Sequence, residues 1–362
     1  MRQINTLIKT THNCNLRCKY CFHQKYGYTG NLIKIENVKK YIDLLDEKYS
    51  LINIVWHGGE PLLAPIEFYE EIYDYCDKKN SNFRFSVQTN GTLLDDKKIK
   101  FFKDNNTGIG LSFDGLNNEQ MRSRTSKILD NIQLLQDNGY NTGAIMVVNQ
   151  ANVFQLIEEY EYFKEINLGL KLNPMFIDGA AKDKVELYLN PDDYINNFIN
   201  LFKYWTKDIN GNINISNCSE LVDLVLNEHS NICTHSSCLT QWLCLDTDSN
   251  IYPCDRLCYP QFLLGNVEDI NDIESVFETP NFIYLLDNSV KRREKCIEEC
   301  EYYKNCYSGC NANLFLEKEQ IKNNNLACYI QKNILKELKK YILEAKKEDK
   351  SLNPMYQKIL RK

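Results

Sequence analysis

Three cysteines near the amino terminus, Cys14, Cys18 and Cys21, have a C-x3-C-x2-C spacing. An iron–sulfur cubane normally takes four thiolates, so three thiolates in one short loop would bind three irons and leave the fourth free. A free iron can bind a small molecule, which separates a catalytic centre from a closed structural one. An aromatic residue, Phe22, follows directly. A zinc loop without its fourth ligand and three buried thiols remain the alternatives.

A second set of ten cysteines, of fifteen in the whole chain, lies between residues 233 and 328. The amino terminus lacks the apolar core of a signal peptide, and disulfides are rare in a reducing cytoplasm. We therefore expect many of these thiols to bind metal. Thiolates alone do not distinguish iron–sulfur clusters from two zinc ions in a cross-braced module, so both interpretations stay open from composition.

The elements that must position the first cysteines alternate between strands and helices. Apolar alternation predicts a strand over 5–11 that leads into the cysteine loop, and amphipathic spacing predicts a helix over 35–48. Further strands are expected over 51–56, 83–89, 109–113, 143–148 and 168–173, with helices over 65–79, 95–104, 124–137 and 153–165. This repeated order predicts an α/β fold with a parallel sheet and crossover helices.

Motifs follow the first four of these strands directly. Parallel strands bring their carboxyl ends to one edge, where such folds bind ligands. The motifs occupy residues 14–21, 58–61, 88–91 and 112–115. Their shared position predicts one site at that edge. Taken alone, Gly58-Gly59-Glu60-Pro61 would also suit a tight strand-to-helix turn.

The cysteine loop with its following aromatic residue resembles that of the radical SAM superfamily. The resemblance implies a partial (β/α)6 radical SAM barrel. It also implies a [4Fe–4S] cluster on Cys14, Cys18 and Cys21 whose open iron binds S-adenosylmethionine (SAM). In that family, one electron cleaves SAM to a 5′-deoxyadenosyl radical. Phe22 would lie beside the bound SAM.

The later loops resemble SAM-binding motifs of the same family. Gly58, Gly59, Glu60 and Pro61 resemble the GGEP motif, which takes the SAM amino group. The stretch Gln88-Thr89-Asn90-Gly91-Thr92-Leu93 and the loop Ser112-Phe113-Asp114-Gly115 are similar to those of anaerobic sulfatase-maturating enzymes. The resemblance places Gln88, Asn90, Ser112 and Asp114 at SAM or substrate.

An arginine follows these motifs where the family pairs one with the SAM carboxylate. Arg124 occupies that position, and a guanidinium suits a carboxylate well. Arg122 is a rival for the same role. The segment before it departs from the family, which has Pro and a His-Asp or His-Asn pair where this chain has Leu116, Gln120 and Met121. We expect this departure to affect the substrate more than the cofactor.

Eight of the later cysteines resemble a SPASM domain, the auxiliary-cluster module of many peptide-modifying radical SAM enzymes. The family's interleaved order implies that Cys238, Cys244, Cys254 and Cys310 hold auxiliary cluster one, and that Cys296, Cys300, Cys306 and Cys328 hold auxiliary cluster two. This gives three [4Fe–4S] clusters in all. The family usually has C-x2-C where this chain has Cys296-x3-Cys300. Four cysteines remain, Cys76, Cys218, Cys233 and Cys258, of which the last two flank ligands and could substitute for one.

Asp255 follows Cys254 directly, where the sulfatase-maturating relatives have the acid that serves as their general base. Once a radical removes a hydrogen atom, a carboxylate there can take the second proton, and the nearby auxiliary cluster can take the remaining electron. The alternative is an ordinary turn aspartate.

Charge and hydropathy restrict the partners and the location. The net charge is −6, from 43 basic and 49 acidic residues, which disfavours a nucleic-acid partner. No apolar run is long enough for a membrane span, so we expect a cytoplasmic protein. The expected domains are a radical SAM barrel over 1–228, a SPASM domain over 229–335 and a helical tail over 336–362. A flavodoxin- or ferredoxin-type donor would supply the electron.

The substrate implied by the resemblance is a side chain of a peptide or protein. We favour a maturase of a ribosomally made peptide that forms a thioether or carbon–carbon cross-link. The alternative is an anaerobic sulfatase maturase that oxidises Cys or Ser to formylglycine. The 88–93 match and Asp255 support the alternative, whereas the segment after Gly115 and the spacing at Cys296 count against it. A third hypothesis, an electron-transfer iron–sulfur protein, predicts no cleavage of SAM.

Overall fold

Strands and helices alternate through the first half of the chain, as the sequence predicts. The strands are β1 (Gln3–Thr11), β2 (Leu51–Gly58), β3 (Asn82–Thr89), β4 (Gly108–Ser112), β5 (Gly143–Val148) and β6 (Gly169–Pro174). The helices are α1 (Ile35–Asp46), α2 (Ile66–Cys76), α3 (Asp96–Asp104), α4 (Asn118–Met121), α5 (Thr125–Asp137), α6 (Leu156–Glu165) and α7 (Pro191–Lys207).

Among the residues that the structure describes, the second half is mainly helical and also contains short strands. Its helices are α8 (Ser216–Asn227), α9 (Pro280–Glu299), α10 (Tyr303–Cys306), α12 (Leu326–Ala345) and α13 (Pro354–Leu360). Its strands are β7 (Trp242–Leu245), β8 (Asn250–Tyr252) and β9 (Gly265–Asn266). The structure, a computed structural model, describes residues 2–28, 30–228, 233–236, 238–313, 326–345 and 352–360.

The chain forms two compact units, each assembled from separate stretches of sequence. The first contains residues 1–112, 122–142 and 238–288, and the second contains 113–121, 143–237 and 289–362. These units interleave along the chain, whereas the domains expected from sequence are consecutive. The boundary expected at residue 229 lies outside the described residues, and the domain division stays a prediction.

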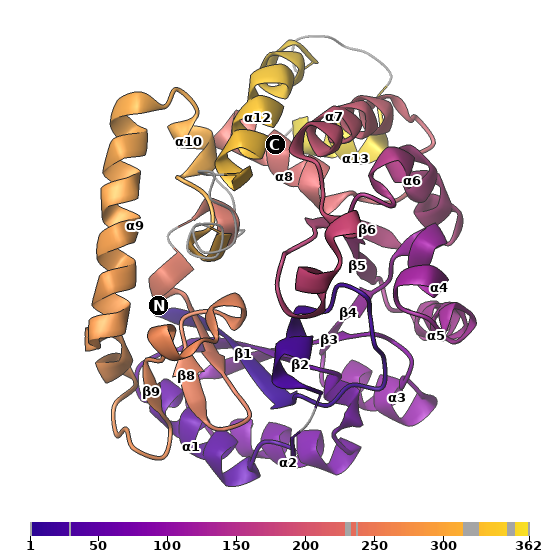
Figure 1. Ribbon diagram of the computed structural model, residues 1–362. Coiled ribbons are helices and arrows are strands. Elements are labelled where there is room, and N and C mark those ends of the chain that lie inside the picture. Colours follow the sequence, from indigo (N-terminus) through magenta and orange to yellow (C-terminus); the bar gives the residue numbers. More distant parts are fainter. Residues whose placement is uncertain are drawn as a thin grey trace. The chain divides into compact units, whose positions relative to one another are not determined.

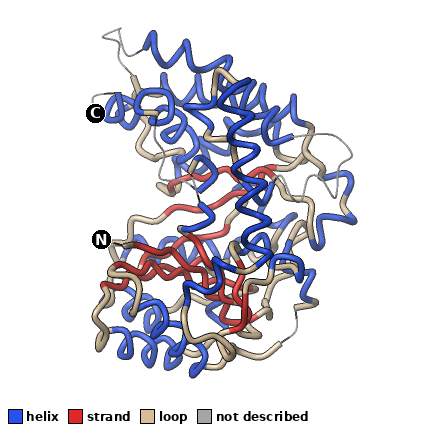
Figure 2. The backbone as a smooth tube through the Cα atoms, turned by 90° about the vertical axis from the view of Figure 1, so that its left-hand side faces the viewer, coloured by secondary structure: helices blue, strands red, loops and turns tan. Residues whose placement is uncertain are grey.

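The first unit is built on a sheet with the strand order β4-β3-β2-β1-β7-β8-β9. Neighbours from β4 to β7 are parallel, and β8 is antiparallel to both of its neighbours. Figure 1 shows α1, α2 and α3 along one side of β1–β4, and Figure 2 shows the strands as adjacent red segments. The carboxyl ends of β1–β4 therefore lie at one edge, as predicted.

Strict alternation in β2 explains the two faces of this sheet. Ile52, Ile54 and Trp56 are buried, and the Trp56 ring packs edge-on against Tyr69 of α2 at 5.4 Å. Burying side chains of this size contributes about 1.5–3 kcal/mol each. Residues between them point to the opposite face, because successive side chains of a strand alternate. That opposite face carries His57, and it holds the polar groups described below.

The second unit pairs β5 with β6 in parallel and packs helices together around them. The last two helices contact α7 through aromatic rings: Phe202 lies 6.2 Å from Tyr341, and Trp205 lies 5.8 Å from Tyr356. One face of α12 is thus buried, and α13 begins at Pro354.

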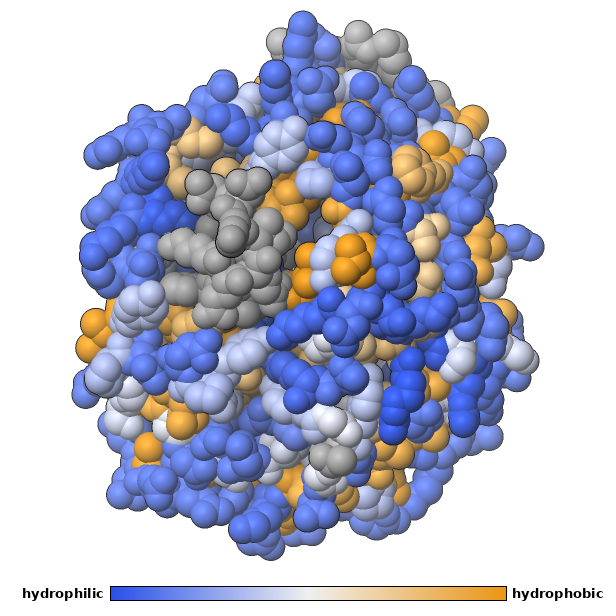
Figure 3. Space-filling view, in the orientation of Figure 1, coloured by the Kyte–Doolittle hydropathy of each residue, from blue (hydrophilic) through white to orange (hydrophobic). Residues whose placement is uncertain are grey.

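The molecular surface is mostly polar on the face drawn in Figure 3, where hydrophobic residues form small separate groups. Within the part of the chain that the structure describes, every helix is too short or too polar to cross a bilayer.

Candidate active site

The cysteine loop follows β1 and turns tightly. Cys14, Cys18 and Cys21 are partly buried thiols, and the amide of Cys21 donates to the carbonyl of Cys18 at 3.2 Å. The amide of Leu16 also donates to Cys14 Sγ at 3.4 Å. Amide donors to sulfur stabilise thiolates that bind iron, so this loop fits the ligand set of an iron–sulfur cluster.

Two side chains from other loops also point their nitrogens at these sulfurs. Asn90 Nδ2 lies 3.9 Å from Cys14 Sγ, and Arg122 Nη1 lies 3.8 Å from Cys18 Sγ. Asn90 further donates to Asn15 Oδ1 at 2.8 Å. Residues after β3 and before α5 therefore contribute to the surroundings of the cysteine loop.

The glycine pair after β2 lies directly against the backbone of the cysteine loop. The Gly59 amide donates to the Thr11 carbonyl, and the Glu60 amide donates to the Asn13 carbonyl, both at 2.8 Å. A Cβ at Gly59 would overlap the carbonyl oxygen of Asn13, and Gly58 has a positive φ of 126°. Only glycine permits this approach and this backbone conformation, so the pair fixes the position of the cysteine loop.

Glu60 connects the loop after β2 to the loop after β3. Its carboxylate accepts hydrogen bonds from Thr89 Oγ1 at 2.6 Å, the Asn90 amide at 2.8 Å and the Leu62 amide at 3.0 Å. Burial raises the pKa of Glu60, and these hydrogen bonds oppose that rise. Glu60 therefore holds the loop after β2 and the loop after β3 together, while its contact with SAM remains a prediction.

The predicted motifs of the first unit do come together. The loops after β1, β2 and β3 share the contacts above, and Gln88 Nε2 donates to Ser112 Oγ at 3.0 Å, which adds the end of β4. Asp114 belongs to the second unit, where it is buried and its carboxylate accepts the Val147 amide at 3.0 Å. In that unit Asp114 fixes its loop to β5.

The two rival arginines have different surroundings. Besides its contact with Cys18, Arg122 places its guanidinium 5.3 Å from the centre of the Tyr20 ring. Arg124 is exposed at the start of α5, with a positive φ of 57°. The geometry favours Arg122 over Arg124 as the cation beside the cysteine loop.

A buried ion-pair network lies on the sheet face that carries His57. Strand register places Lys9 beside His57 of β2 and Leu7 beside Cys244 of β7. Lys9 Nζ lies 3.0 Å from Asp255 Oδ1 and 3.4 Å from Asp246 Oδ2. It also donates to Tyr26 Oη at 3.0 Å. Lys9 thus joins two carboxylates that follow β7 and β8.

Electrostatics keep the Lys9–Asp255 pair ionised. Burial opposes charge on both groups, yet the Lys9 ammonium holds the pKa of Asp255 well below its usual range. The Asp255 carboxylate correspondingly raises the pKa of Lys9. Asp255 is therefore a carboxylate at neutral pH.

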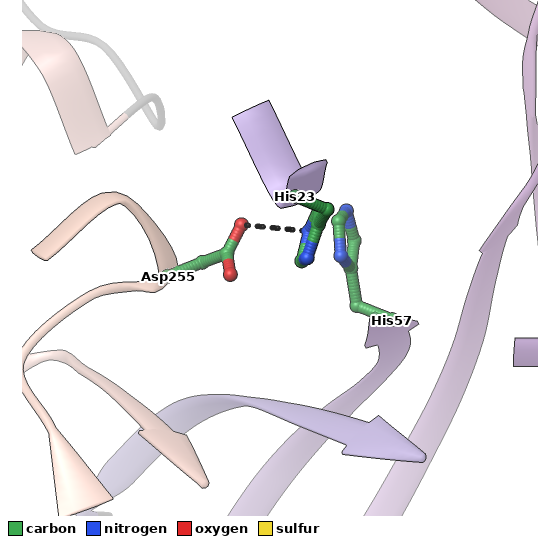
Figure 4. A group of neighbouring side chains, drawn as sticks. All are labelled: His23, His57 and Asp255. Carbon is green, nitrogen blue, oxygen red and sulfur yellow. Dashed lines mark ion pairs between the residues drawn. The ribbon is translucent and has the colours of Figure 1, made fainter. Parts of the chain in front are cut away.

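Histidines complete this network. Figure 4 shows His23, His57 and Asp255 pointing toward one another, with His23 Nε2 3.9 Å from Asp255 Oδ2. Burial lowers the pKa of both histidines, which favours their neutral forms. The three groups lie close enough to hold a metal ion, but Lys9 already supplies positive charge to Asp255. On the other side of Lys9, His12 contacts Asp246 at 2.9 Å.

Apart from Asp255, these network residues were not predicted from the sequence, although Lys9, His57 and His23 each carried a signal. Lys9 is the one charge in the otherwise apolar or neutral stretch of the first predicted strand, and His57 precedes the glycine pair directly. His23 lies two residues after Cys21. Asp246 carried no comparable signal, because only the pairing of β7 with β1 places it beside Lys9.

The cysteines expected at auxiliary cluster one are divided between the units. Cys238, Cys244 and Cys254 belong to the first unit, in the short 3-10 turn 238–240, within β7 and just after β8. Cys310 belongs to the second unit, four residues after α10 ends. Within the first unit, Cys244 is fully buried on the same sheet as Lys9.

The four cysteines expected at auxiliary cluster two lie near one another in the second unit. Burial, with smaller contributions from the charges of Cys328, Cys296 and Cys300, raises the pKa of Cys306 to about 12. The Cys300 amide donates to the Cys296 carbonyl at 3.0 Å, so these two cysteines are one helical turn apart. Residues i and i+4 share a helix face, which explains how the longer C-x3-C spacing still presents both thiols together.

Comparison with known proteins gives matches along nearly the whole chain. The profile of the Radical SAM superfamily matches residues 8–190. The cysteine-type anaerobic sulfatase-maturating enzyme of Clostridium novyi (strain NT) is 28% identical, covering 93% of this chain and 96% of that enzyme. The serine-type enzyme of Bacteroides thetaiotaomicron is 25% identical, covering 83% of this chain and 81% of that enzyme.

Solved structures give a consistent result. Native anSMEcpe with bound AdoMet and Kp18Cys peptide matches with a TM-score of 0.84 and 26% identity, over 95% of this chain and 99% of that chain. Streptococcus suis SuiB bound to precursor peptide SuiA matches with a TM-score of 0.63 over 90% of this chain and 74% of that chain. Its 15% identity supports a shared fold alone.

Proposed function

Because this chain belongs to the radical SAM superfamily, we propose that it oxidises a cysteine in a sulfatase-type protein segment to formylglycine. The predicted α/β radical SAM fold with a cysteine-rich carboxyl-terminal region is confirmed. The prediction that the protein is a radical SAM enzyme is also confirmed. The order of the two substrate hypotheses is reversed. The cysteine-type and serine-type relatives described above are sulfatase-maturating enzymes and match over most of their length, so the alternative is favoured over peptide cross-linking.

Two features that counted against this function have structural explanations. The longer spacing at Cys296 is one turn of helix. The altered segment after Gly115 is held by Glu159 of α6, whose carboxylate accepts the Leu116 amide at 3.0 Å and Asn117 Nδ2 at 3.1 Å. Neither feature requires a different reaction.

The enzyme would carry three [4Fe–4S] clusters, as expected from the sequence. Cys14, Cys18 and Cys21 would hold the SAM-binding cluster, and Cys296, Cys300, Cys306 and Cys328 would hold auxiliary cluster two. Cys238, Cys244 and Cys254, with Cys310, would hold auxiliary cluster one. When bound, these groups and SAM supply a 5′-deoxyadenosyl radical that takes one hydrogen atom from the substrate Cβ, and an acceptor for one electron.

The observation that supports the proposal most directly is the position of Asp255. This buried carboxylate pairs with Lys9 of β1, the strand that leads into the cysteine loop. Loss of a hydrogen atom from Cβ makes the substrate thiol strongly acidic, and Asp255 would take its proton. The cysteine side chain then has lost two hydrogens and becomes a thioaldehyde. Water replaces the sulfur to give the aldehyde and hydrogen sulfide, which balances the reaction.

The test uses full-length protein reconstituted with iron and sulfide under anaerobic conditions. It is incubated with SAM, a chemical reductant and a peptide containing Cys-x-Pro-x-Arg. Mass spectrometry measures conversion of cysteine to formylglycine, and an aldehyde-reactive probe measures the product independently. Matched peptides carry Ser or Ala in place of the reactive Cys.

Aldehyde from the Cys peptide and none from the Ala peptide would support the proposal. Aldehyde from the Ser peptide alone would make the chain a serine-type enzyme. Release of 5′-deoxyadenosine with every peptide unchanged would contradict a sulfatase-type substrate and favour a peptide maturase. Replacing the chemical reductant with reduced flavodoxin or ferredoxin tests the proposed electron donor.

A further inference from the structure

Cys258 is a buried cysteine of the first unit that none of the proposed clusters uses. Its sulfur lies 3.8 Å from Cys244 Sγ, and both thiols pack with Tyr252 in one apolar cluster. Cys258 is 5% exposed and Cys244 is fully buried. Water therefore does not compete for the contact between the two sulfurs, which strengthens any hydrogen bond between them.

One short turn places Cys258 there. The chain makes a single 3-10 turn at Asp255–Leu257, in which the Leu257 amide donates to the Cys254 carbonyl at 2.9 Å. This turn points the Asp255 carboxylate and the Cys258 thiol toward Cys244, so that ligand atoms of all three residues lie within 4.8 Å of one another. Asp255 directly follows the proposed ligand Cys254, and Cys258 comes four residues after that ligand. Both residues thus lie beside the Cys244 sulfur.

We propose that Cys258 donates an S–H···S hydrogen bond to Cys244 and thereby raises the reduction potential of auxiliary cluster one. The inference rests on the assignment of Cys244 as a ligand of that cluster under the proposed function. Hydrogen bonds to ligand sulfurs favour the reduced, more negative form of an iron–sulfur cluster. A higher potential would make this cluster a better acceptor for the electron that leaves the substrate.

The same thiol has one competing acceptor, the Cys254 carbonyl at 3.6 Å. A single S–H proton cannot serve both acceptors fully. A metal-bound thiolate carries negative charge and accepts a stronger hydrogen bond than a neutral carbonyl.

The distance between the two sulfurs also indicates that Cys258 is a hydrogen-bond donor to Cys244 and not a further ligand of the cluster. Two thiolates on one tetrahedral ion with bonds of about 2.3 Å lie about 3.8 Å apart, so Cys258 is placed to reach only the iron that Cys244 already binds. Each iron of a cubane takes one cysteine. Cys258 therefore acts on the bound Cys244 as a positioning residue.

The experiment is a redox titration of full-length reconstituted protein, followed by electron paramagnetic resonance. Cys14, Cys18 and Cys21 are replaced by alanine, so that only the auxiliary clusters contribute signals. In that background Cys258→Ala is compared with Cys258→Ser, which keeps a donor. Cys76→Ala is the matched control, because Cys76 is a buried cysteine on α2 of the same unit.

We expect Cys258→Ala to keep the iron content of its parent and to shift one auxiliary midpoint potential to a more negative value. Cys258→Ser should recover most of that shift, and Cys76→Ala should leave both potentials unchanged. Unchanged potentials in Cys258→Ala would overturn the proposal. Loss of about four irons per chain would overturn it too, because Cys258 would then be a ligand.

A second measurement detects the proton itself. Electron–nuclear double resonance on the reduced protein without Cys14, Cys18 and Cys21 should detect a coupled proton that disappears after reconstitution in D2O and that is missing from Cys258→Ala in the same background. Absence of that proton would contradict the proposed bond. Both measurements omit the peptide, so failure to form formylglycine leaves their result unaffected.

Discussion

Lys9 Nζ lies 3.0 Å from Asp255 Oδ1, and both side chains are almost completely buried. The two residues belong to distant parts of the sequence, the first strand and the turn after β8. Their contact exists because β7 pairs in parallel with β1 and β8 pairs with β7, which brings the turn after β8 close to Lys9. The pair therefore links the proposed base to the strand that leads into the cysteine loop.

Removing the charge of Lys9 should destabilise the protein strongly. Lys9→Met leaves Asp255 and Asp246 buried without their cation, and breaking a buried ion pair costs about 3–5 kcal/mol. Urea unfolding at equal iron content measures this loss. The double variant Lys9→Met/Asp255→Asn should recover part of it, because one uncompensated carboxylate is then removed.

A surface ion pair provides the control for that experiment. Lys39 contacts Glu71 at 2.6 Å with both side chains partly exposed, so Lys39→Met should cost about 1 kcal/mol or less. If Lys9→Met costs no more than Lys39→Met, the buried pair does not have the energetic role assigned to it.

Replacing Asp255, the proposed base, should separate the cleavage of SAM from the formation of formylglycine. Asp255→Asn keeps the size of the side chain and leaves the cysteine loop intact, so 5′-deoxyadenosine should still form in the presence of peptide. Formylglycine should fall roughly 10²- to 10⁴-fold, the usual contribution of a positioned acid or base. Asp269→Asn, at an exposed position of the same unit, is the control. Wild-type aldehyde formation by Asp255→Asn would exclude the role.

The sequence was sufficient for features that depend on neighbours along the chain. The C-x3-C-x2-C loop, the glycine pair and the alternation of β2 each follow from a few consecutive residues. The Lys9–Asp255 contact depends instead on which strand pairs with β1. Nothing local to residues 242–245 indicates that β7 adds to β1 rather than to another edge. The spacing of Cys296 and Cys300 was counted as a departure because the family usually has C-x2-C there. The helix α9, which contains Cys296 and ends one residue before Cys300, was not predicted.

Backbone conformation explains why the sequence did not identify which of Arg122 and Arg124 lies beside the cysteine loop. They are two residues apart, and the resemblance favoured Arg124 by position alone. Ser123 and Arg124 both have positive φ, at 78° and 57°, which turns the chain sharply between them. This leaves Arg122 beside Cys18 and Arg124 exposed. Such conformations are uncommon for residues other than glycine and are not evident from a Ser-Arg pair.

Arg122 should therefore matter more than Arg124 for SAM. Arg122→Met removes the guanidinium beside the cysteine loop, and loss of a hydrogen bond to a charged group should raise the KM for SAM roughly tenfold or more. Arg124→Met should change it less than twofold, a small effect expected for an exposed side chain. The rate of 5′-deoxyadenosine formation against SAM concentration gives both values. A larger effect from Arg124→Met would reverse the assignment.

The glycine after β2 should be required for the SAM-binding cluster specifically. A Cβ at Gly59 would meet the Asn13 carbonyl, so Gly59→Ala must displace the cysteine loop or the turn. We expect a loss of about four irons per chain, with the auxiliary clusters retained. Gly108→Ala is the matched control, because a Cβ there would have only an ordinary contact of 3.6 Å with Ser86. SAM cleavage by Gly59→Ala at the wild-type rate would contradict this reasoning.

Glu159 should make the stability of the protein depend on pH. Burial raises the pKa of Glu159 to about 7 from an ordinary value of 4.5, although the Leu116 amide and Asn117 oppose this shift. Because the folded pKa is raised, the contribution to stability is fully present below pH 4.5 and is lost as pH rises through 7. The loss amounts to about 3 kcal/mol at most. Urea unfolding between pH 5 and pH 8 measures it. Glu159→Gln, which cannot ionise, should flatten this part of the profile, and an unchanged slope in that variant would assign the pH dependence to another group.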